Sequence, residues 1–546
     1  MSEIFKSIIA FFTTLFMLFT SPGQESHTVI NKNFSFTYLE YPAEAVKTLK
    51  DWGITEAEWK SRADAVGEVF TQAQGYEDIN GIVVSPYYKV YVEGKSVPVY
   101  ATTVFVGSTQ KGELHSFSEI YLPKGANCSF NFQINSENVY LSDVKVLPES
   151  LNLKPTCSAY VVNTRISKYG TYTFLFNNGS QSHSYTLFVK EQVDEEQEIA
   201  NLKTQYGEDR VHVVEKGFYP MEYVSIRDGS IIYYLKQGAY LLANHKFDIM
   251  SEEESNSTIE EGASADNGIG LTRYPFLNFF NCNTVKILGN GVIDLSHLDR
   301  HERRGIVFTF CNDIEVRDVK IINPPEWSFI TYRCNGVKIK DVDIFGYRQN
   351  SDAFAICNSQ NVTVDDCFAR SGDDLFDVKT LGGDENAISK NVTFTNCIAW
   401  NGKARCFGIC GEVNRPISDV TFKDCAVIYH DATWNADRIP ALAIIVEQGG
   451  GSISNVTYEN IEIYRASSRA IGCLILNNDI GNFNIENINY KNISYSSSLP
   501  NKFASNNMTT NKLSANLENI KYNGLPVVEL SPSLFEYDNY ATLTIK

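Results

Sequence analysis

Three aspartates give this sequence of 546 residues its clearest chemical signal: Asp352 and, 21 residues later, the adjacent pair Asp373 and Asp374. A protonated carboxyl group can act as a general acid, and a carboxylate can activate water as a general base. Glycoside hydrolysis needs one group of each kind beside the bond that breaks. If the fold crowds these side chains, repulsion raises the pKa of one and leaves its neighbours ionised, so acid and base separate without a cofactor.

An internal repeat determines where these aspartates lie. From residue 275 onward, short segments such as Cys334-Asn-Gly-Val-Lys-Ile recur, each holding two or three alternating strands separated by Asn, Gly and Asp turns. A repeat of about 20 to 30 residues made only of strands is typical of a parallel β-helix, in which each coil covers the open end of the previous coil. The marker positions are Val285, Ile314, Val337, Val362, Val392, Val420 and Val456, at intervals of 29, 23, 25, 30, 28 and 36 residues.

The repeat also supplies a register between coils. Four consecutive coils carry a core strand with Phe329, Phe354, Phe376 or Phe407, and we expect these rings to stack inside. The residues two places earlier then form an outward column, and parallel strands lie about 4.8 Å apart, so three carboxylates crowd one surface patch. The alternative is that they are solvated turn residues, which is our interpretation of Asp365 and Asp366. The column comprises Trp327, Asp352, Asp374 and Arg405.

Asn350-Ser351-Asp352 followed by Gly372-Asp373-Asp374 resembles the paired motifs of polygalacturonase-like glycoside hydrolases of the pectin-lyase-like superfamily. The resemblance covers residues 210 to 500 and implies a right-handed parallel β-helix. It also implies an inverting mechanism in which Asp373 is the general acid while Asp352 and Asp374 hold the attacking water, with no metal ion or cofactor.

The match departs from that family at two places. Arg405 stands where the family has the histidine of a Gly-His-Gly motif, and Ala441–Glu447 has no counterpart of the Arg-Ile-Lys motif that grips galacturonate. Dextranase-type β-helix hydrolases are similar in another way, because they place a β-sandwich before the helix and keep three aspartates without the histidine. The identity of the sugar therefore stays open.

Further residues on the same face are candidates for binding the sugar. Aromatic rings stack on the apolar faces of sugars. Cationic side chains either bind acidic sugars or neutralise the aspartates, and for Lys379 we favour neutralisation of the aspartates. For each aromatic candidate, including Trp400, ordinary packing is the alternative. A single histidine such as His430 is more typical of a structural residue than of a catalytic one. Glu447 is a weaker alternative acid or base. The predicted substrate-binding residues are Trp327, Tyr347, Arg348, Lys379, Arg405, His430 and Trp434.

The rest of the chain predicts an exported protein in three parts. Lys6 and the apolar run Ile8–Thr20 indicate a signal peptide over residues 1–24. Residues 25–195 predict a smaller β-sandwich-like module that begins with a helical pattern at Tyr41–Ala73, and residues 205–546 predict the catalytic β-helix. The polar segment Ser251–Gly268 predicts a surface loop, and Lys190–Glu198 a junction. The fold class is therefore all-β.

Cysteine spacing favours buried thiols over disulfides. Cys282, Cys311, Cys334 and Cys357 recur at coil spacing, as do Cys367, Cys397 and Cys425, so equivalent positions should stack in columns. Their pattern gives no support to a zinc site. The Asn-x-Ser/Thr matches at Asn361 and Asn391 lie in the repeated strand, where turn chemistry explains them better than glycosylation.

Composition narrows the function classes. With 43% hydrophobic residues and a net charge of −18, the chain is neither disordered nor suited to nucleic acid or anionic membranes. We predict a secreted or periplasmic monomer that hydrolyses a polysaccharide or oligosaccharide, without a membrane partner after signal cleavage. The alternatives are a polysaccharide lyase, which often uses calcium, and a non-catalytic glycan-binding β-helix.

Overall fold

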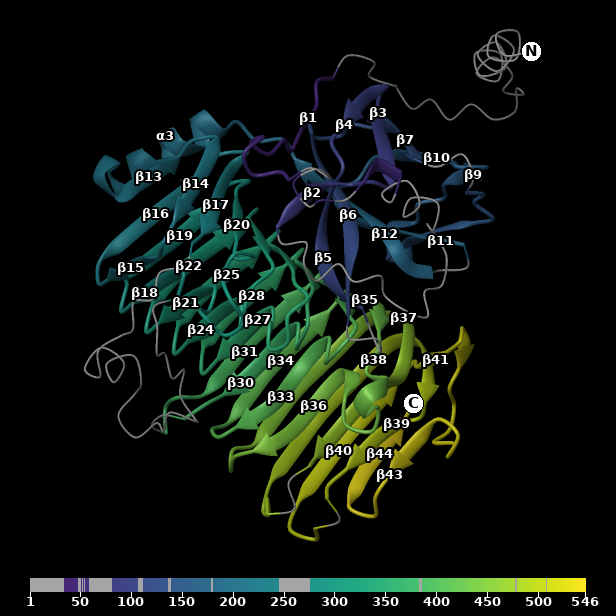
Figure 1. Cartoon of the computed structure of the whole chain (residues 1–546). Helices are drawn as coiled ribbons and strands as arrows, with labels where there is room; N and C mark the ends of the chain where they lie inside the picture. Colours follow the sequence, from purple (N-terminus) through teal and green to yellow (C-terminus); the bar gives the residue numbers. More distant parts are fainter. Residues whose placement is uncertain are drawn as a thin grey trace. The chain divides into compact units, whose positions relative to one another are not determined.

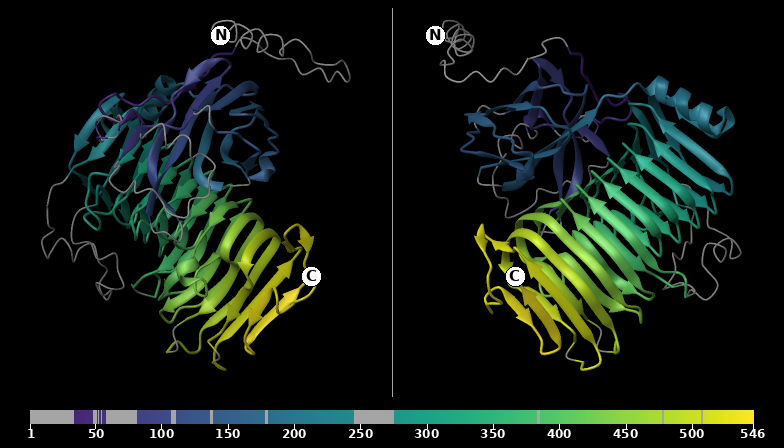
Figure 2. Two further views of the ribbon diagram at one scale, coloured as in Figure 1. Left: turned by 45° about the vertical axis from the view of Figure 1, so that its right-hand side comes forward. Right: turned by 180° about the vertical axis from the view of Figure 1, so that it is seen from behind.

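The computed structural model describes residues 34–47, 51, 53, 55–57, 81–106, 111–135, 139–177, 180–244, 275–382, 385–476, 479–506 and 508–546. Ser35–Lys546 form one compact unit. Within it, two small sheets precede one long sheet that winds as a solenoid (Figures 1 and 2). The predicted all-β class with a parallel β-helix is confirmed, while the predicted domain boundaries stay predictions.

The two small sheets pack face to face. One is ordered β2-β5-β6-β12-β11-β8 with β1 beside β6, and the other β4-β3-β7-β10-β9. Pairing is antiparallel except between β6 and β12. The strands are β1 (Thr37–Tyr38), β2 (Ile82–Val84), β3 (Tyr88–Val92), β4 (Lys95–Val97), β5 (Tyr100–Val106), β6 (Lys111–Leu122), β7 (Cys128–Ile134), β8 (Val144–Leu147), β9 (Thr156–Ser158), β10 (Val161–Ile166), β11 (Gly170–Phe176) and β12 (Ser180–Glu191), with a 3-10 turn at Glu149–Leu151.

Alternating burial explains this packing. Strand β7 reads Cys-Ser-Phe-Asn-Phe-Gln-Ile, with every second side chain buried, as expected for a strand with one face on a core. Its Phe132 ring lies 5.9 Å from that of Phe174 on β11 and 4.7 Å from that of Tyr185 on β12. The aromatic rings therefore form the shared core of the two sheets, as the predicted β-sandwich requires.

A helix that the sequence analysis did not predict follows the sandwich. Helix α3 (Glu195–Tyr206) begins where the Asp194 side chain accepts a hydrogen bond of 3.1 Å from the Gln197 amide. Asp three residues before Gln, with acidic residues in the first turn, is a known helix-start pattern and could have revealed it. A 3-10 turn at Glu208–Arg210 leads from α3 into the solenoid.

The solenoid repeats three strands per coil, and each strand pairs in parallel with the third strand after it over most of its length. The first half comprises β13 (Val211–Val214), β14 (Gly217–Met221), β15 (Val224–Arg227), β16 (Ser230–Leu235), β17 (Ala239–Ala243), β18 (Leu277–Phe280), β19 (Thr284–Leu288), β20 (Val292–Asp294), β21 (Ile306–Thr309), β22 (Asn312–Arg317), β23 (Lys320–Ile322), β24 (Phe329–Tyr332), β25 (Asn335–Lys340), β26 (Asp343–Phe345), β27 (Phe354–Cys357), β28 (Gln360–Asp365) and β29 (Phe368–Arg370). The second half comprises β30 (Phe376–Thr380), β31 (Ser389–Thr395), β32 (Ile398–Asn401), β33 (Phe407–Val413), β34 (Ile417–Lys423), β35 (Ala426–His430), β36 (Pro440–Gln448), β37 (Ile453–Ile475), β38 (Asn484–Leu499), β39 (Asn501–Ala504), β40 (Lys512–Glu518), β41 (Lys521–Tyr522), β42 (Leu525–Pro526), β43 (Phe535–Tyr537) and β44 (Ala541–Ile545), with a 3-10 turn at Thr433–Asn435.

The predicted phenylalanine stack fixes the register of the coils. Phe329 pairs with Phe354, Phe354 with Phe376, and Phe376 with Phe407. The last two ring pairs lie 5.1 and 4.9 Å apart in nearly parallel planes. The interior is therefore a stack of equivalent side chains, and the outward positions beside it are also equivalent from coil to coil.

Side-chain columns support the solenoid inside and at its turns. All twelve cysteines are free, and the thiols of Cys282, Cys311 and Cys334 follow one another along the stack. The prediction for Cys357 was wrong, because it pairs with Tyr332, two positions before Cys334 in that column. Asn391 donates to Asn361 at 2.7 Å, and both residues have positive φ, which supports turn chemistry at these positions.

A group of four charged side chains joins the sandwich to the solenoid, and we call it the interface tetrad. It consists of Glu119 on β6, Lys190 on β12, Lys320 on β23 and Asp343 on β26, all buried. Lys190 lies 3.6 Å from Glu119 and 3.4 Å from Asp343, and Lys320 pairs with the same two carboxylates. Two cations thus form ion pairs with two anions between the sandwich and the solenoid.

Three predictions fall wholly or mainly outside the described residues: the signal peptide at 1–24, the helical pattern at Tyr41–Ala73 and the loop at Ser251–Gly268. These stay predictions. Among the helices that the structure does describe, none has the length and apolar character needed to cross a membrane.

Candidate active site

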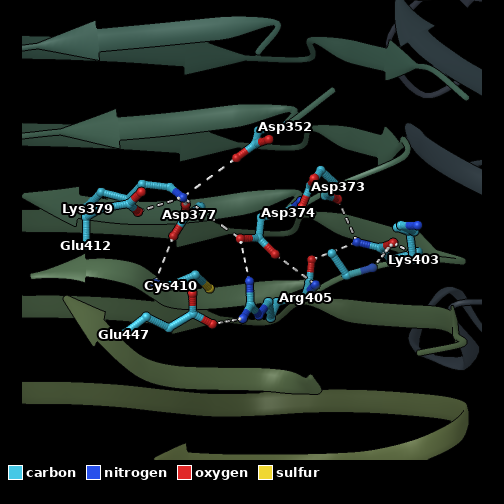
Figure 3. Close-up of polar contacts among 12 residues, drawn as sticks. Asp352, Asp373, Asp374, Asp377, Lys379, Lys403, Arg405, Cys410, Glu412 and Glu447 are labelled. Atoms are coloured by element: carbon cyan, nitrogen blue, oxygen red, sulfur yellow. Dashed lines mark hydrogen bonds and ion pairs between the residues drawn. The ribbon is translucent and has the colours of Figure 1, made fainter. Parts of the chain in front are cut away.

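The outward column predicted from the repeat is present on the solenoid (Figure 3). The amide of Ser328 donates to the carbonyl of Asp352 at 2.8 Å, that of Ala353 to Asp374 at 2.9 Å, and that of Leu375 to Arg405 at 3.1 Å. These bonds place Trp327, Asp352, Asp374 and Arg405 at equivalent positions just before four neighbouring strands.

Asp352, Asp373 and Asp374, which we call the triad, come together at this column. One carboxylate oxygen from each lies within 4.8 Å of the others. Asp352 and Asp374 are buried, whereas Asp373 is half-buried. The Oδ2 atom of Asp373 accepts a hydrogen bond of 3.2 Å from the amide of Asn350, one coil earlier.

The small residues of the two motifs hold these coils together. Ser351 Oγ lies 2.6 Å from Ser371 Oγ and accepts a hydrogen bond of 3.0 Å from the amide of Gly372. A Cβ atom on Gly372 would stand 2.0 Å from the carbonyl oxygen of Arg348, so only glycine allows this approach. The motif spacing therefore brings the aspartates of adjacent coils to one place.

Burial and mutual repulsion shape the ionisation of the triad. Burial, together with the charge of Asp374, raises the pKa of Asp373 to about 6, although Lys379 and Arg405 oppose this. Burial and then the charge of Asp373 raise the pKa of Asp352 well above its usual value, while Lys379 again opposes. Neighbouring carboxyl groups this close titrate as a coupled set rather than one by one.

Lys379 is bound on several sides by carboxylates. Its Nζ atom lies 3.0 Å from Asp377, 3.3 Å from Glu412, 3.7 Å from Asp352 and 4.0 Å from Asp374. Arg405 bonds Asp374 at 3.3 Å and Glu447 at 2.9 Å. We call these residues with the triad the carboxylate cluster: Asp352, Asp373, Asp374, Asp377, Glu412 and Glu447 with Lys379 and Arg405.

The sequence analysis missed Asp377, Glu412 and Asn401. The amide of buried Asn401 donates to the carbonyls of Asp373 and Arg405, both at 2.8 Å, and so ties the two coils together. Asp377 could have been found from the repeat, because the neighbouring coils carry Ala355 and Gly408 at its position. No comparable signal distinguishes Asn401 from the many turn asparagines.

A chain of hydrogen bonds through Asn401 and Lys403 connects Trp434 to the backbone of Asp373. Asn401 Oδ1 accepts from the Lys403 amide at 2.8 Å, and the carbonyl of Lys403 accepts from Trp434 Nε1 at 2.8 Å. The Lys403 ammonium lies 4.8 Å from the centre of the Trp434 ring, and half of Trp434 remains exposed. An exposed ring held in this way can stack on a sugar.

The other predicted sugar-binding residues divide into partly exposed side chains and buried ones. Trp327 is partly exposed, with the Lys379 ammonium 5.0 Å from its ring centre, and Tyr347 is partly exposed beside Arg348. Arg348 donates to the carbonyl of Ser296 at 2.7 Å and so braces a preceding turn.

Two candidate residues lie in the interior. His430 is completely buried, its Nδ1 lies 3.0 Å from Ser468 Oγ, and burial lowers its pKa to about 4. The predicted sugar contact therefore does not fit the position of His430, because its side chain is completely buried. Trp400 is likewise buried and stacks on Arg370.

The triad oxygens are close enough together to bridge a divalent cation. Lys379, however, already supplies positive charge to Asp352 and Asp374. The ammonium of Lys379 is thus one counter-charge already present beside these carboxylates.

The fold is a parallel β-helix, and the comparisons show similarity of its central part to polygalacturonases. The family description "Glycosyl hydrolases family 28" matches residues 289–498. The chain is 28% identical to a polygalacturonase from Juniperus ashei over 173 residues, which is 31% of this chain and 32% of the relative. It is 24% identical to a polygalacturonase from Chamaecyparis obtusa over 213 residues, 35% of this chain and 39% of that protein. The matches thus span between a third and two fifths of these relatives.

A solved structure shares the fold over a longer stretch. Dex49A from Penicillium minioluteum superposes with a TM-score of 0.53 over 88% of this chain and 97% of its own, at 13% identity. The arrangement of a β-sandwich followed by a β-helix is therefore found in a known protein. At this identity the similarity shows the fold alone.

Proposed function

We propose that this chain is a glycoside hydrolase that cleaves glycosidic bonds in a polysaccharide or oligosaccharide. The observation that carries the proposal is the triad: three carboxylates from adjacent coils, with oxygens within 4.8 Å, on the outer face of the solenoid. Burying like charges together is costly, and nothing in the packing of neighbouring coils asks for it. Acid–base cleavage of a glycosidic bond does use such a group.

In the proposed mechanism, Asp373 protonates the oxygen of the departing sugar. It is the most exposed of the three aspartates, and its raised pKa of about 6 keeps a proton available in mildly acidic solution. Asp352 and Asp374 bind the attacking water, and both carboxyl groups lie beside Lys379, with Arg405 also bonded to Asp374. Water then attacks the anomeric carbon, which the resemblance implies to invert its configuration.

One observation favours a retaining mechanism as the second candidate. Inverting enzymes usually separate their two carboxyl groups by about 6.5–9.5 Å, and retaining enzymes by about 5–5.5 Å. The triad oxygens all lie within 4.8 Å of one another, which is nearer to the second range. Nuclear magnetic resonance of the first product formed distinguishes the two, since inversion and retention release opposite anomers.

A substrate panel tests hydrolysis itself. We expect wild-type protein in chelator to release sugars from at least one of polygalacturonate, dextran and other plant and microbial polysaccharides, and Asp373→Asn to lose that activity. Asp365→Asn is the matched control, because Asp365 is a turn aspartate bonded to Thr395 at 2.7 Å outside the site. Products that absorb in the ultraviolet and vanish with chelator would instead identify a lyase, and binding without turnover a glycan-binding protein.

We also propose that the protein is exported, on the strength of the signal-peptide pattern in residues 1–24. Amino-terminal sequencing of the protein from the culture medium or periplasm tests this. A mature chain that begins near residue 25 supports export, and a cell-associated chain that begins at Met1 contradicts it.

A further inference from the structure

The outer face of one solenoid coil carries an ion pair where its neighbours are apolar. Asp377 and Lys379 lie two residues apart on β30, so both side chains point outward on the same face. Asp377 continues a column of Val307, Ile330 and Ala355 on one side and Gly408 and Ala443 on the other. Lys379 follows Thr309, Tyr332 and Cys357 in its own column.

This buried pair is expensive and is confined to the coil of Asp373 and Asp374. Placing a lysine and an aspartate where small or apolar side chains suffice carries a desolvation cost that packing does not require. Asp377 is held by the Cys410 amide, which donates to its Oδ1 at 3.1 Å, and lies 3.0 Å from Lys379. Asp377 therefore holds the ammonium group of Lys379 in place.

The ammonium of Lys379 distinguishes among the three aspartates. It lies 3.7 Å from Asp352 and 4.0 Å from Asp374, whereas Asp373 is not among the four carboxylates within 4.0 Å. A cation at that distance favours the ionised form of a carboxyl group. From this geometry we infer that Lys379 is a positioning residue, whose ammonium lies closest to Asp352 and Asp374 and so favours these two, more than Asp373, as the water-binding carboxylates.

This inference rests on the proposed hydrolase function and deepens it. Several charged and titratable groups face Lys379: Asp352 before β27, Cys357 on β27, Asp374 and Asp377 at β30, and Glu412 on β33. Burial strongly raises the pKa of Asp352, and Lys379 is the cation that opposes it. Without that cation, the pKa of Asp352 would rise further above its usual value.

Two variants should move the pH profile of kcat/KM in opposite directions. Lys379→Met removes the cation, so the base ionises only at higher pH and the acidic limb moves upward by about one pH unit or more. Asp377→Asn removes a neighbouring anion while keeping an acceptor for the Cys410 amide, so the limb moves downward. Lys379→Arg keeps the charge and should restore the wild-type limb.

A control and a double variant separate this effect from a folding defect. Lys340 also pairs with Asp365 and Asp366, at 3.3 and 2.9 Å, but lies half-exposed on β25, so Lys340→Met should leave the limb unchanged. If Lys379→Met does not fold, the double variant Asp377→Asn/Lys379→Met leaves one buried anion fewer without its cation and should still show the upward shift. An unchanged limb in a folded variant without Lys379, or shifts of the same sign in the two single variants, would overturn the inference.

A readout without turnover keeps the inference distinct from the proposed function. The ionisation of Asp352 can be followed in aspartate carboxyl ¹³C spectra as the signal that disappears in Asp352→Asn. We expect this signal to titrate at higher pH in Lys379→Met than in wild type. If the wild type hydrolyses no glycan but the titration shifts, the proposed function fails and the role of Lys379 stands. If hydrolysis is normal and the titration does not shift, the inference fails alone.

Discussion

The interface tetrad is fully buried and the carboxylate cluster is partly buried, and the two groups of charged side chains also differ in composition. The tetrad sets Lys190 and Lys320 against Glu119 and Asp343, two cations for two anions. The cluster sets only Lys379 and Arg405 against six carboxylates. The first group is electrically balanced, and the second carries a surplus of negative charge.

The balance appears in the ionisation of each group. Burial alone would raise the pKa of Glu119, but the two ammonium groups of the tetrad hold it below its usual value. In the cluster, burial and repulsion raise the pKa of Asp377 to about 7 despite Lys379. Burial, together with Glu119, raises the pKa of Asp343 in the tetrad in spite of both lysines. The surplus of carboxyl groups in the cluster is the feature that suits acid–base chemistry.

Breaking the tetrad should have the largest effect on stability and little on chemistry. Lys320→Met leaves Asp343 and Glu119 buried with one cation, so the free energy of unfolding should fall by about 3–5 kcal/mol. Denaturant unfolding measures this, and the folded fraction should keep the wild-type pH profile of kcat/KM. A stable variant with a shifted profile would show that the two groups are not separate in function.

Removing Arg405 should instead affect the chemistry more than the fold. Arg405→Met takes a charged hydrogen bond worth about 1.5–3 kcal/mol from Asp374, which corresponds to a loss of about 10- to 100-fold in kcat. Glu447→Gln, on the far side of the same guanidinium, should cost less, since it leaves the bond to Asp374 intact. Steady-state kinetics of both variants check this order, and a larger loss in Glu447→Gln would favour Glu447 as an acid or base.

The pH dependence of activity should reflect the cluster alone. Asp373 has a pKa raised to about 6 by burial and by Asp374. A general acid works only when protonated, so kcat/KM should be retained below this pH and fall as the pH rises through about 6. The profile of wild-type protein measures this limb, and a limb that stays flat to pH 8 would exclude Asp373 as the acid.

The smallest effect is expected at the exposed ring of Trp434. Aromatic stacking contributes about 0.5–1.5 kcal/mol, so Trp434→Ala should raise KM by about 2- to 12-fold with kcat nearly unchanged. Trp400→Phe is a useful comparison, because Trp400 is buried and should affect stability only. An unchanged KM in Trp434→Ala would place the sugar elsewhere on the face.

The solenoid and the triad were predictable because both follow from periodicity. The phenylalanine register put Asp352 and Asp374 in one column, and the coils pair as that register requires. Periodicity does not report which outward positions are covered. His430 was therefore predicted to contact the sugar although it is completely buried, and Cys357 was assigned to a column that lies two positions away from it.

Contacts between segments far apart in the chain could not be predicted from the sequence. The pairing of Glu119 with Lys320 joins residues 201 positions apart through sheet packing that no local pattern encodes. Helix α3 is a different case, since its Asp194 cap was legible in the sequence but lay in a segment interpreted as a junction. The sequence revealed the three aspartates of the site. It did not reveal Asp377 and Glu412, which are neighbouring charges that act on the site through Lys379.

The role of Asp373 as general acid is the central claim, and the leaving group tests it most directly. Once the panel has identified the sugar, the corresponding glycosyl fluoride provides a substrate whose leaving group needs no proton. We predict that Asp373→Asn loses about 10²- to 10⁴-fold in kcat/KM on the natural glycan but retains most of its activity on the fluoride. Equal losses on both substrates would contradict the assignment, and so would full activity on the glycan.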